Sequence, residues 1–227
     1  METKAFRQKV TASDLANKEL VIAACTLAEK RHNGQRRKSG ELFIEHPLAV
    51  GDLLLDIGQS AEVVAAGVLH DVPEDTKTTL QEIEKQFGQT VALLVNGVTQ
   101  QIEPGTDEVT RKRVYYFKLI AMVQTDWRIM LIRLADRLHN MRTLRSLSKA
   151  AQKRIARETL EVYIPMAYLL KNWFVDFDFQ TIYPWLGELQ HLSHQYLDGT
   201  GLDGLVDLVT NGCQIEQDRL KQEVGGQ

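Results

Sequence analysis

The sequence predicts an all-α fold, a helical bundle followed by a helical C-terminal appendage. Apolar residues recur at helical spacing over most of the 227 residues. Alternating runs of Val, Ile and Thr bounded by turn residues, the usual signal of a β-strand, are nearly absent. With 44% hydrophobic and 25% charged residues, the chain is long enough to bury a substantial core.

The first part of the chain contains three predicted helices. Ser13 is placed to cap a helix over residues 14–32, and Pro47 suits the first turn of a helix over residues 47–56. The stretch between these two helices is rich in Gly, Lys, Arg and Ser, which indicates a loop. Residues 61–71 are rich in Ala and Val and should form a buried central helix.

Further helices are expected through the middle of the chain. Thr78 or Thr79 can cap a short helix that ends at Gly88. A loop containing Pro104 and Gly105 is expected over residues 102–108. The other predicted helices cover residues 89–100, 109–125, 126–144 and 149–171.

The chain changes character after residue 171. It is first rich in aromatic residues and then in glycines, and one more helical stretch is expected near residues 202–222. We therefore predict a main domain over residues 1–171 and a helical extension over residues 172–227 that packs on it. Aromatic residues of the extension could also form a dimer face, so a homo-oligomer is allowed.

Charge and cysteine content narrow the function classes. The net charge is −3 and the pI is about 6.1, so neither a nucleic-acid polymer nor an anionic membrane is expected as a partner. Cys25 and Cys213 form neither a CxxC pair nor a disulfide framework, which favours a reducing cytoplasm. The chain also contains no apolar run approaching the roughly 18 residues of a membrane span.

Four residues form a candidate metal site. His70 and Asp71 are adjacent at the end of the predicted central helix and offer one imidazole nitrogen and one carboxylate oxygen. His46 upstream and Asp136 downstream would complete a four-ligand set. Two nitrogens and two hard oxygens suit a divalent metal that keeps positions open for water and phosphate.

Each of these residues also has a structural explanation. Taken alone, a histidine is more often an ordinary core or surface residue than a ligand. Asp136 follows a strongly apolar run, where a carboxylate must be paired or bound to a metal. A buried ion pair with Arg133 or Arg137 would meet that need without a metal.

Glu74 and Asp75 lie about one helical turn beyond the His-Asp pair. Pro73 disfavours helical conformation at Val72, so we expect a rigid turn that points both carboxylates back toward the metal. In a hydrolase such carboxylates would orient the attacking water and exchange protons with it or with the leaving group. Solvated residues after a helix end are the alternative interpretation.

A basic cluster on the predicted loop could reach a phosphate at the metal. It runs Arg36-Arg37-Lys38-Ser39-Gly40 and ends shortly before His46. Arginine can clamp phosphates through two hydrogen bonds or stack on a base. A solvated turn is the alternative.

Asn140 and Thr143 extend the candidate site along the predicted helix of Asp136. Asn140 lies four residues after Asp136, which places both on one helical face, and Thr143 follows three residues later. An ordinary helix with its polar edge in water would look similar. His139 is expected to point elsewhere and not to be a ligand.

Several motifs in the same order resemble the hydrolase domain of the Rel/Spo alarmone enzymes, which belong to the HD phosphohydrolase superfamily. The resemblance covers roughly residues 15–170. Its motifs are Arg37-Lys38-Ser39-Gly40-Glu41, Ile44-Glu45-His46-Pro47, His70-Asp71-Val72-Pro73-Glu74-Asp75-Thr76, Phe87-Gly88, Gly97-Val98-Thr99 and Leu134-Ala135-Asp136-Arg137-Leu138-His139-Asn140-Met141-Arg142-Thr143-Leu144.

The resemblance implies an all-helical HD domain that binds one divalent metal, typically Mn²⁺. It implies removal of the 3′-pyrophosphate from guanosine tetra- and pentaphosphate, giving GDP or GTP plus pyrophosphate. By position it implies metal ligands at His46, His70, Asp71 and Asp136, a catalytic pair at Glu74 and Asp75, and nucleotide contacts at Arg37, Lys38, Ser39, Asn140 and Thr143.

The chain departs from the family pattern at three places. Leu42-Phe43 stands where the family usually has Pro-Tyr, and Pro73 replaces an aliphatic or small residue. The sequence ends at Gln227 without the synthetase domain of the long members, which predicts a small stand-alone alarmone hydrolase. Two alternatives are the same chemistry on adenosine alarmones or another 3′- or 2′-phosphorylated nucleotide, and a module that binds alarmone without cleaving it.

Overall fold

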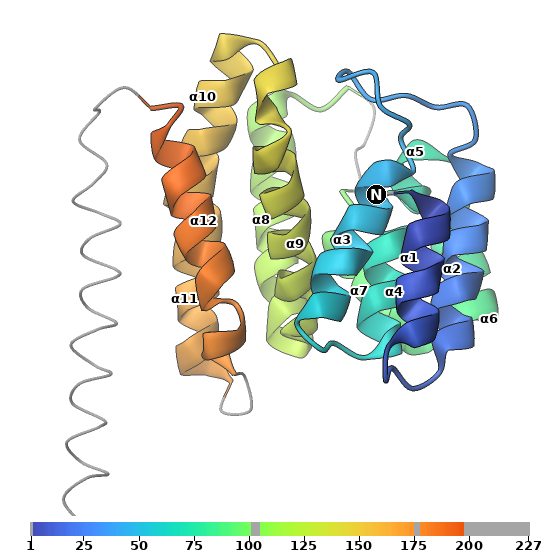
Figure 1. The fold of residues 1–227 in the computed structure, drawn as a ribbon. Helices are drawn as coiled ribbons and strands as arrows, with labels where there is room; N and C mark the ends of the chain where they lie inside the picture. The colour runs from blue at the N-terminus through green and yellow to red at the C-terminus, as the bar shows by residue number, and fades with distance from the viewer. Residues whose placement is uncertain (1, 101–104, 175–177, 198–227) are drawn as a thin grey trace, which may run out of the picture. The chain divides into compact units, whose positions relative to one another are not determined.

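The computed structural model describes residues 2–100, 105–174 and 178–197 (Figure 1). The chain divides into two compact units, Met1–Ser146 and Leu147–Gln227. The first unit contains α1 (Thr3–Ala12), α2 (Lys18–Arg31), α3 (Glu45–Asp56), α4 (Ala61–Leu69), α5 (Val72–Asp75), α6 (Leu80–Phe87), α7 (Gln89–Val98), α8 (Glu108–Thr125), α9 (Arg128–Arg142) and η1 (Leu144–Ser146). The second contains α10 (Lys149–Glu158), η2 (Thr159–Tyr163), α11 (Ile164–Trp173), η3 (Phe179–Thr181) and α12 (Tyr183–His194).

The all-α prediction is confirmed. No β-strand occurs within the described ranges, where extended pairing is limited to one isolated bridge between Arg36 and Leu42. That bridge closes the predicted loop before α3, because the N–H of Arg37 bonds the carbonyl of Glu41 and the N–H of Phe43 bonds that of Gln35, both at 3.0 Å.

The expected cap at Ser13 is wrong. Ser13 ends α1, with its Oγ donating to the carbonyl of Val10 at 2.8 Å, and α2 begins only at Lys18. Asn17 separates the two helices at φ 55°, a left-handed conformation that asparagine adopts more readily than most residues. The sequence interpretation also missed α1, whose buried Phe6 and Val10 lie one turn apart on one face.

Most other helix boundaries agree with the sequence prediction. Thr79 caps α6 with a capping box that includes Glu82, and Gly88 ends the helix at φ 88°. The helix expected over residues 149–171 forms as α10 and α11, joined by the π-helical turn η2. The described part of the predicted loop at 102–108 is non-helical up to Asp107, and the stretch expected near 202–222 lies outside the described residues.

The predicted domain boundary at residue 171 does not coincide with the boundary between the compact units, which falls after Ser146. Compactness and the extent of a functional domain are different properties. The division into a hydrolase domain over residues 1–171 and an extension over residues 172–227 therefore stays a prediction.

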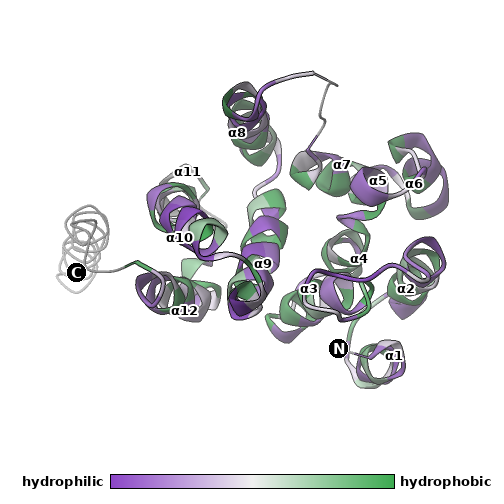
Figure 2. Ribbon diagram, turned by 90° about the horizontal axis from the view of Figure 1, so that it is seen from above, coloured by the Kyte–Doolittle hydropathy of each residue, from purple (hydrophilic) through white to green (hydrophobic). Residues whose placement is uncertain are grey.

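Helix α4 is the centre of the first unit. It contacts α2, α3, α7 and α9, and every residue of α4 except Glu62 is buried (Figure 2). Two glycines allow α3 and α4 to approach closely, because a Cβ on Gly51 would lie 2.6 Å from Cγ2 of Val68 and one on Gly67 would meet Leu54. This contact fixes the end of α4 relative to the start of α3.

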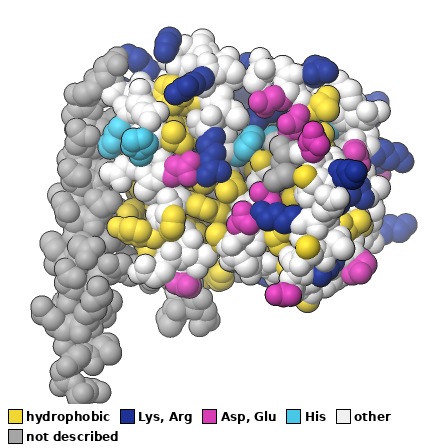
Figure 3. All heavy atoms as spheres, in the orientation of Figure 1, with side chains coloured by type: hydrophobic (Ala, Val, Ile, Leu, Met, Phe, Trp, Pro, Cys, Tyr) yellow, Lys and Arg dark blue, Asp and Glu magenta, His cyan; other side chains and the backbone are white. Residues whose placement is uncertain are grey.

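The surface of the first unit carries mixed charge. Figure 3 shows basic and acidic side chains interspersed on one face rather than gathered into a patch of one sign.

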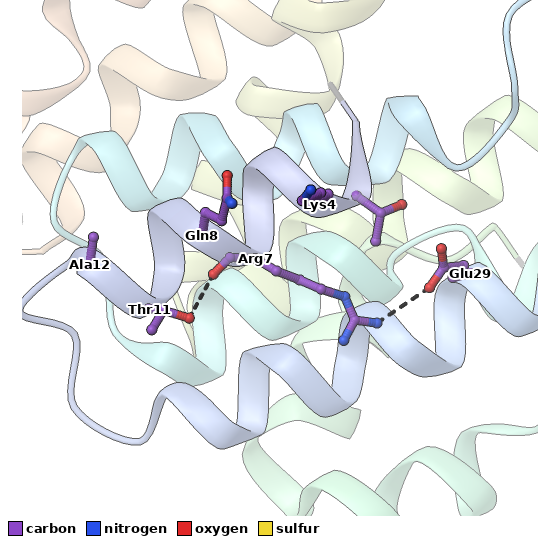
Figure 4. Close-up of a pocket in the computed structure, with 7 residues that line it drawn as sticks. Lys4, Arg7, Gln8, Thr11, Ala12 and Glu29 are labelled. Carbon is purple, nitrogen blue, oxygen red and sulfur yellow. Dashed lines mark hydrogen bonds and ion pairs between the residues drawn. The ribbon is translucent and has the colours of Figure 1, made fainter.

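A surface pocket of about 640 Å³ lies along α1, where Arg7 pairs with Glu29 at 3.3 Å (Figure 4). None of the predicted site residues lines it. Among the described helices, none combines the length and apolar character that crossing a membrane requires.

We predict that Gly67→Ala destabilises the protein by roughly 1–3 kcal/mol, because the added methyl group forces Leu54 out of its packed position. Gly187→Ala in α12 is the matched control, since a Cβ there meets nothing within 4 Å. The control should be neutral or stabilising by about 0.5–1 kcal/mol. Denaturant unfolding followed by circular dichroism measures both changes. Equal stability of the two variants would contradict the packing argument.

Candidate metal and active site

The structure brings the four predicted metal ligands together. His46 lies in the first turn of α3, His70 and Asp71 follow α4, and Asp136 lies in α9. Nε2 of His46 lies 3.5 Å from Oδ2 of Asp71 and 3.2 Å from Oδ1 of Asp136. Nε2 of His70 lies 3.0 Å from Oδ1 of Asp71 and 3.8 Å from Oδ1 of Asp136. Ligand atoms of His46, His70 and Asp136 all lie within 4.8 Å of one another.

The hydrogen bonding of His70 shows what this arrangement needs. Its Nδ1 lies 2.7 Å from the carbonyl oxygen of Gly67, which can only accept, so Nδ1 carries the hydrogen. In the neutral ring the lone pair is then on Nε2, which is buried without a hydrogen-bond partner and faces carboxylate oxygens. A lone pair facing negative oxygens is unfavourable unless a cation lies between them. The donor set therefore fits a divalent metal ion.

The electrostatics of the cluster favour positive charge. Burial acts to lower the pKa of His70, but the charges of Asp71 and Asp136 outweigh it and raise that pKa to about 9. Burial acts to raise the pKa of Asp136, but Arg133 and both histidines hold it well below its usual range. The field that retains a proton on His70 would equally attract a divalent cation, which would displace that proton.

Asp136 combines the two roles that the sequence left as alternatives. Its Oδ2 accepts a hydrogen bond from Nη1 of Arg133 at 2.8 Å, so the buried ion pair exists. Its Oδ1 points toward the ligand cluster and lies 3.2 Å from Nε2 of His46. The guanidinium of Arg133 also lies 5.0 Å from the ring centroid of Tyr115. The ion pair therefore orients the carboxylate and does not exclude it as a ligand.

The two candidate catalytic carboxylates lie on the single helical turn α5. Pro73 occupies the start of this turn, where its missing N–H is not needed. Oε1 of Glu74 accepts a hydrogen bond from the N–H of Gln100 at 2.5 Å. Both acidic residues are exposed to solvent, as the alternative interpretation expects, but partial desolvation on the side of the cluster and the charge of Asp71 raise the pKa of Glu74 to about 7 and also raise the pKa of Asp75. Glu74 can therefore exchange a proton near neutral pH.

Two of the five predicted nucleotide contacts are linked to the ligand cluster, Asn140 directly and Arg37 through Asn140. Nη2 of Arg37 donates to Oδ1 of Asn140 at 2.6 Å, and Nδ2 of Asn140 donates to Oδ1 of Asp136 at 2.5 Å. Because arginine can only donate, this chain also fixes which end of the Asn140 amide faces the carboxylate.

The other three predicted contacts lie differently. Lys38 and Ser39 are exposed on the loop before α3, and Oγ of Ser39 donates to Glu41 at 3.4 Å. The hydroxyl of Thr143 donates to backbone carbonyls of its own helix, those of His139 at 3.2 Å and Asn140 at 3.3 Å. The structure thus brings Arg37 and Asn140 to the cluster but does not show these three residues bonded to it.

The chain is similar to known proteins of one family. The profile of the family described as HD domain matches residues 24–173. A probable guanosine-3′,5′-bis(diphosphate) 3′-pyrophosphohydrolase from Synechocystis is 40% identical over 204 residues, covering 89% of this chain and 25% of the relative. The bifunctional (p)ppGpp synthase/hydrolase SpoT of Escherichia coli K12 is 43% identical over 168 residues, covering 71% of this chain and 24% of the relative.

The chain belongs to the HD domain family. It spans about a quarter of the length of the relatives it matches. A solved structure of a metazoan ortholog of SpoT, described as hydrolyzing ppGpp, has a similar fold, with a TM-score of 0.55, 24% identity and coverage of 84% of this chain and 99% of that one. The HD domain is therefore related to the hydrolase domains of the alarmone enzymes, as the sequence motifs predict.

The expectation that His139 points away from the site is wrong. Its Nδ1 lies 2.8 Å from Nδ1 of His46, and Nη1 of Arg37 approaches the same atom at 3.4 Å. Burial lowers the pKa of His139, and the neighbouring His46 and Arg37 lower it further, to about 3, so the ring is neutral. The spacing contained the signal, because residues three apart in a helix share a face and His139 lies three after Asp136.

Lys118 is a residue that sequence reasoning missed. Its ammonium group donates to Oδ1 of Asn96 and to the carbonyl of Thr99, both at 3.0 Å, and so ties α8 to the end of α7. The next residue, Gln100, supplies the N–H that binds Glu74. Lys118 therefore supports the backbone segment that holds the candidate catalytic carboxylate. Nothing in the sequence pattern indicates this link, because it joins residues far apart in the chain.

We predict that Mn²⁺ stabilises this HD domain against heat, by about 2.7 kcal/mol at 100 times its Kd. His70→Ala should abolish the stabilisation, because it removes one of the converging nitrogens. His191→Ala, at an exposed position of α12, is the matched control and should retain it. Differential scanning calorimetry with and without Mn²⁺ makes the measurement. An unchanged Mn²⁺ effect in His70→Ala would remove His70 from the ligand set.

Proposed function

We propose that this chain hydrolyses the 3′-pyrophosphate of guanosine tetra- and pentaphosphate to GDP or GTP plus pyrophosphate, using one Mn²⁺ ion. The observation that carries the proposal is the convergence of two imidazole nitrogens and two carboxylates close to a carboxyl group with a pKa of about 7. The relationship to 3′-pyrophosphohydrolase domains supports the choice of substrate.

In this proposal His46, His70, Asp71 and Asp136 hold the cation. When bound, it supplies Lewis acidity that polarises a phosphoryl oxygen and lowers the pKa of the attacking water. Arg133 keeps Asp136 in position by binding its other oxygen. Gly67 keeps the Nε2 of His70 available by accepting the hydrogen of Nδ1.

Glu74 and Asp75 handle the protons of the reaction. Glu74 accepts a proton from the water as the water oxygen attacks the phosphorus bonded to the 3′ oxygen. The bond between this phosphorus and the 3′ oxygen breaks, and the carboxylate pair returns the accepted proton to the leaving 3′ oxygen, which leaves Glu74 deprotonated again. The N–H of Gln100 holds the Glu74 carboxylate at one oxygen and leaves the other for the water.

Arg37 and Asn140 contact the nucleotide. They bind each other, so a substrate phosphate or base would compete with Asn140 for the guanidinium of Arg37. Lys38, Ser39 and Thr143 are proposed as further contacts from the loop before α3 and the end of α9.

The same chemistry on an adenosine alarmone, or on another 3′- or 2′-phosphorylated nucleotide, is the second candidate. The favouring observation is the loop that carries Arg37. Leu42 is 44% exposed there, and the Phe43 ring stacks on His32 with centroids 4.6 Å apart and offers no phenol oxygen. A base contact that a tyrosine would make is therefore missing.

Pyrophosphate release from guanosine and adenosine alarmones, measured side by side with Mn²⁺ and with chelator, tests the proposal. Rapid, chelator-sensitive release from the guanosine form is the expected result. Release from the adenosine form alone would keep the mechanism and change the substrate. No release from either form, in protein that binds both Mn²⁺ and the alarmone, would favour a non-catalytic binding module.

We predict that Glu74→Gln lowers kcat by about 10²–10⁴-fold while Mn²⁺ affinity stays unchanged, because the amide cannot accept the proton. The base is active when deprotonated, so wild-type activity should be present above the pKa of Glu74 and lost as the pH falls through it. Bound Mn²⁺ favours the carboxylate and moves this midpoint below the value of about 7.

Glu84→Gln, an exposed substitution on α6, is the matched control and should keep the wild-type pH profile. Steady-state kinetics from pH 5 to pH 9 give the comparison. An acid limb that persists in Glu74→Gln would assign the proton transfer to another group.

We predict that Arg37→Ala raises KM for the alarmone roughly 10- to 100-fold, the equivalent of one charge-assisted hydrogen bond. Arg36→Ala is the control on the same loop, because Arg36 is exposed and donates to the carbonyl of Gly40 at 2.7 Å. Initial rates over a range of alarmone concentrations measure both. Equal KM values for the two variants would remove Arg37 from the nucleotide site.

A further inference from the structure

The two ring nitrogens of His46 face different partners. Nε2 points at Asp71 and Asp136, while Nδ1 lies 2.8 Å from Nδ1 of His139. The two rings are tilted by 44°, with centroids 4.9 Å apart. A hydrogen bond between two nitrogens contains one hydrogen, so one ring donates and the other accepts. Which ring donates decides where His46 presents its lone pair.

Arg37 decides the direction of this hydrogen bond. Its Nη1 lies 3.4 Å from Nδ1 of His139, and a guanidinium group can only donate. Nδ1 of His139 must therefore present a lone pair, and the hydrogen between the rings belongs to His46. With its hydrogen on Nδ1, the neutral His46 ring has its lone pair on Nε2, which faces the two carboxylates.

We propose that His139 is a positioning residue that selects the tautomer of His46 in which Nε2 can bind the divalent cation. Arg37, which donates to the same nitrogen, keeps His139 in the accepting orientation. The inference rests on the proposed function, because that proposal makes His46 a metal ligand. It adds a role for a side chain that neither binds the cation nor touches the substrate.

The other histidine of the cluster provides a parallel within the same site. His70 donates its Nδ1 hydrogen to the backbone carbonyl of Gly67 at 2.7 Å. Both histidines thus use an acceptor at Nδ1 and present Nε2 to the carboxylates. Metal-binding histidines in general donate their second N–H in this way, and loss of the acceptor costs about 10–100-fold in metal affinity. Here one acceptor is a side chain, so substitution can remove it.

Mn²⁺ affinity of the full chain, measured from the electron paramagnetic resonance signal of free Mn²⁺, tests the inference without relying on activity. His139→Phe keeps an aromatic ring but has no acceptor, and should weaken Mn²⁺ binding about 10–100-fold. His139→Asn places an amide oxygen near the position of Nδ1 and should restore affinity to within about threefold of wild type. His191→Phe, at an exposed position of α12, is the matched control. Circular dichroism establishes that each variant is folded.

Nitrogen-15 NMR of the histidine rings in metal-free protein provides a second readout. The neutral form of His46 should carry its hydrogen on Nδ1 in the wild type and in His139→Asn. In His139→Phe the hydrogen should move partly or fully to Nε2. This measurement reports which nitrogen of His46 carries the hydrogen. A change in packing alone would not move the hydrogen from Nδ1 to Nε2.

The outcomes separate the inference from the function it rests on. Wild-type Mn²⁺ affinity in folded His139→Phe would overturn the inference and leave the proposed function standing. Equal weakening in His139→Phe and His139→Asn would also overturn it, because the ring would then matter for packing and not as an acceptor. A wild-type protein that binds no Mn²⁺ would contradict the proposed function, and an Nε2–H tautomer of wild-type His46 would independently contradict the hydrogen bond.

Discussion

The negative charge of buried Asp136 and half-buried Asp71 is the constraint on which the rest of the site depends. Both carboxylates face imidazole nitrogens in the interior of the first unit, where an uncompensated charge is costly. Among the described residues, Arg133 compensates part of this charge through its ion pair with one oxygen of Asp136. The carboxylate oxygens of Asp71 and Asp136 face the Nε2 atoms of His46 and His70, and positive charge between them is favourable. A divalent metal ion would supply this charge, and a proton on His70 supplies it without a metal.

The helical core places this charge by packing alone. His46 begins α3, and His70 ends α4, so the close approach at Gly51 and Gly67 brings the two rings to a centroid distance of 5.1 Å. Asp136 reaches the same point because α9 contacts both α3 and α4. The start of α3, the end of α4 and the middle of α9 therefore meet at one polar cluster. A side chain that widened the α3–α4 contact would disturb the site without touching a ligand.

Sequence reasoning was effective where the signal is local. Helical periodicity, the capping box of Thr79 and the adjacent His70-Asp71 pair are all encoded within a few residues, and the corresponding elements form as predicted. The left-handed Asn17 has no comparable pattern, so the start of α2 was predicted at residue 14 instead of Lys18. Lys118 was missed because its partners are distant in sequence. His139 was placed wrongly although its spacing from Asp136 puts both residues on one helical face. Likewise, the pairing of Arg37 with Asn140 depends on how a loop folds against a helix.

The central claim is that His46, His70, Asp71 and Asp136 hold one divalent cation. Anomalous X-ray diffraction from crystals grown with Mn²⁺ tests it most directly. The account predicts one strong manganese peak bonded to Nε2 of both histidines and to a carboxylate oxygen of each aspartate. A peak at another position, or bonding through Nδ1 of either histidine, would contradict it.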